Sequence, residues 1–141
     1  MIELSRVKDK IDSALKQCDR NDSVTIVAAT KSRNPKTVER CIHNGIVNIG
    51  ENRVQEAVKK FNTIQPELVF TKRMIGHLQT NKINKALRTF DTIDSVDSLR
   101  LAKQLAKKLK QTKNSLSVLL EINTSGDKTK FGFDPQNDQD L

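Results

Sequence analysis

Short apolar runs alternate with stretches of helical periodicity along most of this 141-residue chain. Apolar side chains that recur every three to four residues predict helices, and short apolar runs between turn residues predict strands. The predicted helices are 3–19, 35–44, 54–61, 79–89 and 96–109. The predicted strands are 24–30, 46–49, either 68–70 or 74–75, 92–95, and 116–122. Strict alternation of this kind predicts a parallel sheet with right-handed crossovers.

The runs 24–30 and 116–122 are apolar at almost every position rather than at every second one. Continuous apolar patterning is typical of strands that are covered on both faces. Two architectures fit this order, an open doubly wound sheet and a (β/α)8 barrel. A complete barrel takes about 250 residues, so this chain supplies either a small flavodoxin-like sheet or part of a barrel. The pattern leaves both open.

The chain carries a formal charge of +8, which raises the question of a nucleic-acid partner. Its lysines are scattered, and the only aromatic residues are five phenylalanines, which offer little surface for stacking bases. The densest basic set lies on one amphipathic helix, as a solvated face would: Lys103, Lys107, Lys108, Lys110 and Lys113. We therefore expect no nucleic-acid partner.

No run of 18 apolar residues is present, so we expect no transmembrane helix and no membrane partner. The first ten residues mix charges into the apolar pattern, unlike a signal peptide. Cys18 and Cys41 form no metal-ligand pattern, and no other metal-ligand cluster is present. A cytoplasmic protein with reduced thiols is the simplest interpretation.

Polar residues follow each predicted strand, at the end of a parallel sheet where ligands gather in both architectures. These segments are Thr30-Lys31-Ser32, Gly50-Glu51-Asn52, Gly76-His77-Leu78-Gln79, Asp94-Ser95 and Asn123-Thr124-Ser125. Lys31 could attack an aldehyde if apolar neighbours favoured its neutral amine, although most such lysines extend into water. Asn52 could equally cap a helix, and His77 could be a hydrogen-bonded loop residue.

Five segments together resemble the pyridoxal phosphate homeostasis protein (YggS/PROSC) family, over about residues 3–133. They are Ala29-Thr-Lys-Ser32, Ile49-Gly-Glu-Asn-Arg-Val-Gln-Glu56, Ile75-Gly-His-Leu-Gln-Thr-Asn-Lys82, Asp94-Ser-Val-Asp-Ser-Leu99 and Ile122-Asn-Thr-Ser125 with Lys130-Phe-Gly132. The resemblance implies a TIM barrel of the alanine racemase N-terminal type. It also implies that Lys31 holds pyridoxal 5′-phosphate as a Schiff base, with Asn52 and His77 lining the pocket.

The resemblance further implies a carrier without established turnover, with enzymes that lack the cofactor as possible acceptors. A racemase or decarboxylase relative is an alternative, but it would need a second acid–base residue opposite Lys31. A further alternative is a remnant that binds little or no cofactor.

Two features depart from the family pattern. Lys72 and Arg73 stand where an aromatic residue and a histidine are usual, which predicts weaker packing there or a solvated strand start. The chain also ends at Leu141, before the family's last strands and their phosphate-binding loops. We therefore expect residues 1–141 to form a single, incomplete barrel domain of about five β/α units with a polar tail, 134–141. Weak or absent binding of the cofactor is the expected consequence.

Overall fold

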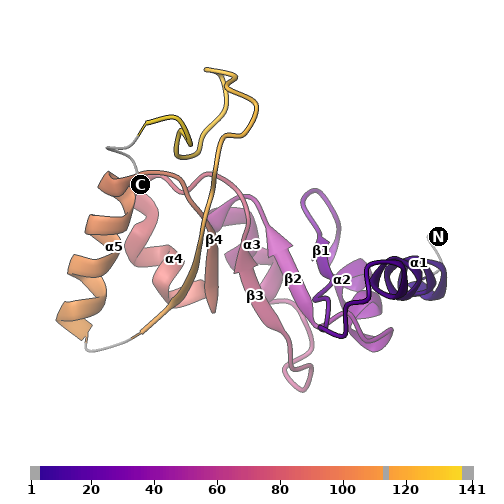
Figure 1. The fold of residues 1–141 in the computed structure, drawn as a ribbon. Coiled ribbons are helices and arrows are strands. Elements are labelled where there is room, and N and C mark those ends of the chain that lie inside the picture. The colour runs from indigo at the N-terminus through magenta and orange to yellow at the C-terminus, as the bar shows by residue number, and fades with distance from the viewer. Residues whose placement is uncertain (1–3, 113–114, 138–141) are drawn as a thin grey trace.

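Parallel strands joined by helices form one sheet in the computed structural model, which describes residues 4–112 and 115–137 (Figure 1). Within these residues the strands are β1 (Val27–Ala29), β2 (Asn48–Glu51), β3 (Thr71–Met74), β4 (Thr92–Val96) and β5 (Ser117–Leu120). The helices are α1 (Leu4–Gln17), α2 (Pro35–His43), α3 (Val54–Phe61), α4 (Ile83–Thr89) and α5 (Leu99–Thr112), with a 3-10 turn, η1, at Thr80–Lys82. None of the helices in this part of the chain is both long and apolar enough to span a membrane.

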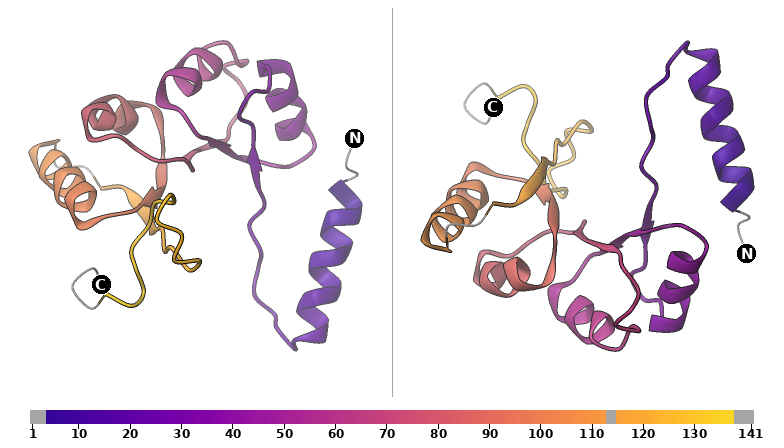
Figure 2. Two further views of the ribbon diagram at one scale, coloured as in Figure 1. Left: turned by 90° about the horizontal axis from the view of Figure 1, so that it is seen from above. Right: turned by 90° about the horizontal axis from the view of Figure 1, so that it is seen from below.

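The order of the strands decides between the two architectures left open by the sequence. The strands lie in chain order, β1-β2-β3-β4-β5, and each pairs in parallel with the next. Figure 2 shows helices α2 to α5 along the outer side of a curved sheet. A doubly wound sheet has helices on both faces, whereas a (β/α)8 barrel has strands in chain order inside a ring of helices. The prediction of a partial barrel is therefore confirmed.

Two local features stabilise the start of helix α2. The Asn34 side chain accepts a hydrogen bond from the Thr37 backbone N–H at 2.9 Å, and Pro35 occupies the first helical position. Both features stabilise a helix start, as the sequence predicts. Val38 and Ile42 then face the sheet and are buried. Helix α1 differs, because none of its residues is buried and it lies apart from the other helices, beyond β1 (Figure 2).

The core lies between the sheet and its helices, in two clusters. One cluster packs α2 against β2 through Val38, Ile42 and Ile49, and it also includes Ile64 from the segment after α3. The other joins α3, α4 and α5 to β3 and β4, and includes Val54, Ala57, Met74, Leu78, Ile83, Ala86, Phe90, Ile93, Val96, Leu101, Leu105 and Phe133. Each fully buried aliphatic side chain stabilises the fold by about 1.5–3 kcal/mol.

The opposite face of the sheet is polar at its centre. Arg73 Nε donates to Asp94 Oδ2 at 2.7 Å, and Arg73 Nη1 donates to Asn48 Oδ1 at 3.3 Å. Arg73 therefore lies inside β3 with a paired charge, rather than at a solvated strand start. The Lys72 ammonium lies 5.6 Å from the centre of the Phe70 ring, within the range of a cation–π contact.

The expected burial of the first and last strands on both faces is wrong. Ala29 of β1 is exposed, and residues 24–26 lie outside the strand. All four residues of β5 are exposed. The reason is position, because β1 and β5 are the edge strands of this sheet, and in the described residues the helices cover one face.

Most element boundaries move by a few residues from their predicted places. The second strand runs to Glu51, and the third, Thr71–Met74, follows the predicted alternative 68–70 and overlaps the alternative 74–75 at Met74 only. Val96 ends β4 instead of starting the last helix. The start of the first predicted helix at residue 3 and the tail residues 138–141 lie outside the described residues, and the division into one incomplete domain stays a prediction.

Candidate functional site

The carboxyl ends of β1 to β4 bring the predicted site residues to one end of the sheet. Ala29 pairs with Gly50, so Lys31 and Asn52 each lie two residues beyond a paired position on neighbouring strands. The Ile75 N–H donates to the Glu51 carbonyl at 3.0 Å, which continues the pairing of β2 and β3 toward Gly76 and His77. Parallel strands end at the same side of a sheet, as the sequence argument requires.

Lys31 lies in a tight turn directly after β1. The Arg33 N–H donates to the Thr30 carbonyl at 3.0 Å, which makes Lys31 and Ser32 the two central residues of the turn. Ser32 has a φ of 59°, in the left-handed region that residues other than glycine, asparagine and aspartate seldom adopt. The Lys31 side chain is exposed, and Thr30 below it is buried. The turn therefore presents a primary amine to solvent from a fixed backbone.

Asn52 and Gly76 are in direct contact across β2 and β3. A Cβ atom at Gly76 would lie 2.6 Å from the Asn52 carbonyl oxygen, so only glycine allows this approach. A cavity of about 370 Å³ opens beside the contact, lined by Asn52, Arg53, Val54, Gln55, Met74, Gly76, His77, Leu78, Gln79 and Lys82. Two of the three predicted site residues, Asn52 and His77, therefore share one cavity.

His77 is held by a carboxylate and an aromatic ring. Its Nδ1 lies 2.6 Å from Asp97 Oδ2, and its ring stacks on Phe131 at a centroid distance of 3.7 Å. An ionised carboxylate accepts and does not donate, so the His77 Nδ1–H donates to Asp97 and Nε2 is left for another partner. Ser98 Oγ donates to the other Asp97 oxygen at 3.0 Å. No role for Asp97 was predicted from the sequence, although a carboxylate directly after β4 is placed to meet a histidine after β3.

The loop after β5 brings Phe131 to this end of the sheet. The Asn123 N–H donates to the Phe133 carbonyl at 2.9 Å, and the Phe133 N–H donates to the Glu121 carbonyl at 2.8 Å. Within the loop, the Thr129 hydroxyl and N–H donate to Asp127, which holds the pKa of that carboxyl below its usual value. These hydrogen bonds fold the loop back on itself, and Asn123 contributes one of them through its backbone N–H.

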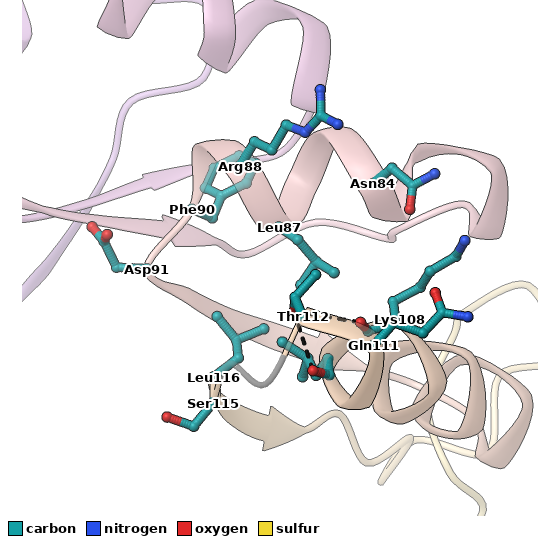
Figure 3. Close-up of a pocket in the computed structure, with 11 residues that line it drawn as sticks. Asn84, Leu87, Arg88, Phe90, Asp91, Lys108, Gln111, Thr112, Ser115 and Leu116 are labelled. Carbon is teal, nitrogen blue, oxygen red and sulfur yellow. Dashed lines mark hydrogen bonds between the residues drawn. The ribbon is translucent and has the colours of Figure 1, made fainter.

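A second cavity, of about 710 Å³, lies between α4 and α5 (Figure 3). Figure 3 shows Phe90 and Asp91 on one side and Ser115 and Leu116 on another, and these residues precede β4 and β5. The cavity is therefore at the amino ends of the strands, opposite His77. In barrels of this type, ligands bind at the carboxyl ends. We place the candidate site at the carboxyl ends for this reason.

Comparison with known proteins identifies the family. Residues 2–141 match the alanine racemase N-terminal domain family. The pyridoxal phosphate homeostasis protein of Aquifex aeolicus is 32% identical over 139 residues, which are 98% of this chain and 60% of that protein. The chain belongs to the alanine racemase N-terminal domain family. The Escherichia coli K12 member is 35% identical over 134 residues, 92% of this chain and 57% of its own length. The chain thus spans somewhat more than half the length of these relatives.

Solved structures agree with this assignment. PipY of Synechococcus elongatus, in a structure with pyridoxal phosphate bound, is 32% identical with a TM-score of 0.74, covering 87% of this chain and 57% of that one. A protein of unknown function from Bifidobacterium adolescentis is 36% identical with a TM-score of 0.83, covering 93% and 57%. An alanine racemase of Clostridium difficile, 12% identical with a TM-score of 0.69 over 92% of this chain and 34% of its own, shares the fold. The cofactor contacts of Lys31, Asn52 and His77 stay predictions.

Proposed function

We propose that this chain binds pyridoxal 5′-phosphate through Lys31 and serves the homeostasis of that cofactor. The observation that carries the proposal is the exposed Lys31 amine, in a hydrogen-bonded turn at the carboxyl end of β1 and next to the strand that leads to Asn52. The cofactor supplies an aldehyde, whose carbon forms a double bond to a lysine nitrogen while its oxygen leaves as water. The relative PipY, which has been solved with this cofactor, supports the assignment.

The residues at this end of the sheet suit such a group chemically. Lys31 provides a primary amine, and Asn52 provides both a donor and an acceptor. Asp97 fixes the His77 ring, so its free nitrogen faces a defined direction. Arg53 and Lys82 line the same cavity as Asn52, and their positive charges suit a phosphate group. We assign the cofactor contacts to Lys31, Asn52 and His77.

We further propose that the protein holds and passes on the cofactor without turning over a substrate. Relatives that match nearly the whole chain are named for homeostasis, which supports a carrier. Enzymes that lack their cofactor would be the acceptors. Incubation with free amino acids should therefore leave their enantiomeric composition unchanged, and any racemisation that depended on Lys31 would contradict the carrier role.

The binding proposal is tested by adding pyridoxal 5′-phosphate, reducing the mixture with borohydride and mapping the labelled lysines by mass spectrometry. We expect Lys31 to be labelled in preference to Lys36, an exposed lysine on the neighbouring helix. The change Lys31→Ala should remove the absorbance change seen on titration with the cofactor, whereas Lys36→Ala should leave it. Equal labelling of the two lysines would show that the chain has no specific site, as a remnant would.

A further inference from the structure

A buried ion pair lies directly beneath the turn that carries Lys31. Glu51, the last residue of β2, is completely buried, and its Oε1 accepts a hydrogen bond from the Lys60 ammonium of α3. Lys60 is itself only 9% exposed, so both charges are removed from water. We call this pair the Glu51–Lys60 clamp. Burying two charges costs several kcal/mol each before their attraction offsets it, so the contacts made by the pair require an explanation.

The Glu51–Lys60 clamp holds Thr30 from two directions. Lys60 Nζ donates to the Thr30 carbonyl at 2.7 Å, and the Thr30 hydroxyl donates to Glu51 Oε1 at 2.5 Å. The Thr30 N–H donates to the Gly50 carbonyl at 2.9 Å. Every polar group of Thr30 therefore has a partner, and Thr30 is only 2% exposed. The peptide group before Lys31, just beyond the end of β1, is thus firmly held.

The same Thr30 carbonyl closes the turn of Lys31. It accepts from the Arg33 N–H as well as from Lys60 Nζ, so the clamp and the turn share one oxygen atom. The turn contains Ser32 in a left-handed conformation, which costs energy that the surrounding structure must offset. A hydrogen bond from a buried ammonium is stronger than one between neutral groups. The clamp therefore stabilises the strained turn by holding its first residue, Thr30, in place.

We propose that Glu51 and Lys60 are positioning residues that hold the Lys31 turn so that its amine faces an aldehyde bound at the carboxyl ends of the strands. The inference rests on the proposed function of Lys31 and adds residues that do not touch the cofactor. An apolar pair of similar size could fill the same space, but it could not donate to the Thr30 carbonyl. Within the described residues Glu51 Oε2 has no hydrogen-bond partner. The pair therefore leaves one of its own buried acceptors unpaired, although every polar group of Thr30 is hydrogen-bonded.

The test replaces the clamp without leaving a lone buried charge. The double variant Glu51→Leu/Lys60→Met exchanges both charged side chains for apolar ones, a change that buried pairs often tolerate. Thr30→Val removes only the hydroxyl contact and provides a second, milder variant. Lys59→Met is the matched control, because Lys59 is the exposed neighbour of Lys60 on α3.

Two measurements are made on each folded variant. Hydrogen exchange of the Arg33 amide, without cofactor, reports the turn, and we expect the double variant to exchange roughly two- to tenfold faster, the factor for one net hydrogen bond. Borohydride trapping with pyridoxal 5′-phosphate reports the amine, and we expect the ratio of Lys31 to Lys36 labelling to fall about tenfold. Thr30→Val should shift both values in the same direction by less, and Lys59→Met should shift neither.

The outcomes separate the inference from the proposed function. Unchanged Arg33 exchange and an unchanged labelling ratio in a folded double variant would show that the clamp is structural only and would overturn the inference. Faster exchange with an unchanged ratio would also overturn it, because the turn would not control the amine. Absence of preferential Lys31 labelling in the unmodified chain would instead overturn the proposed function, and the inference with it.

Discussion

The two edge strands of the sheet, β1 and β5, differ in burial although the sequence makes them look alike. Both come from nearly continuous apolar runs, Val24–Thr30 and Leu116–Ile122. One residue beyond β1, Thr30 is 2% exposed and fully hydrogen-bonded, whereas Val118, Leu119 and Leu120 of β5 are 43%, 54% and 55% exposed. The difference shows that an edge strand can be held at one end by a few buried polar contacts while another is held by its backbone pairing.

The contrast follows from what packs against each strand. The carboxyl end of β1 is bound by β2 and by Lys60 from α3, so a polar group of a helix reaches the strand end. Strand β5 pairs with β4, and its residues are exposed on both faces of the sheet in the described part of the molecule. The site that we propose lies at the carboxyl end of β1, where the strand end is held, and not on the exposed strand β5.

Lys60→Met should have the largest effect, because it leaves the buried Glu51 carboxylate without its counter-charge. We expect the free energy of unfolding to fall by about 3–5 kcal/mol, measured by urea denaturation. The matched change Lys59→Met, at an exposed position on the same helix, should stay within about 0.5 kcal/mol of the unmodified chain. Similar losses of stability for Lys60→Met and Lys59→Met would contradict the claim that Lys60 holds the carboxyl end of β1.

Ile49→Ala should have the next largest effect. Ile49 lies in β2, is completely buried and packs against α2 in the cluster beside β1. Removing a buried aliphatic side chain deletes its contacts and leaves a cavity, so we expect a loss of about 2–5 kcal/mol on urea denaturation. A loss below about 1 kcal/mol would mean that this side of the sheet is packed no better than β5.

Leu119→Ala should have the smallest effect. Leu119 of β5 is 54% exposed, so truncating it removes little buried surface, and we expect a change within about 0.5 kcal/mol. Light scattering provides a second measurement, because an exposed apolar edge strand favours pairing between chains. Leu119→Lys should lower any self-association of the chain. A stability loss for Leu119→Ala as large as that for Ile49→Ala would show that β5 is buried in solution.

The sequence predicted those features that depend on local chemistry or on strand direction. The start of α2 was predictable because Asn34 and Pro35 act within a single turn. The gathering of Lys31, Asn52 and His77 at one end of the sheet was predictable because parallel strands share that end. The exposure of β5 was not predictable, because burial depends on what covers a strand and not on its own residues.

The side-chain partnerships of the site were also beyond the sequence. Lys60 follows the apolar stripe of α3 and has the pattern of an ordinary charged helix end, yet it turns inward to Glu51. Asp97 lies 2.6 Å from His77 because β3 and β4 are neighbours, a fact that appears only with the strand order. Charged residues at such positions are usually exposed, so the pattern alone favours the wrong interpretation.

The chain order of the strands has a consequence for how the protein is made. Each strand pairs with the strand that follows it, so a ribosome that releases the chain from its amino terminus supplies every partner in turn. A sheet that grows in this way always presents its newest strand as an open template. Within the described residues, strand β5 illustrates such an edge, because Val118, Leu119 and Leu120 are all exposed.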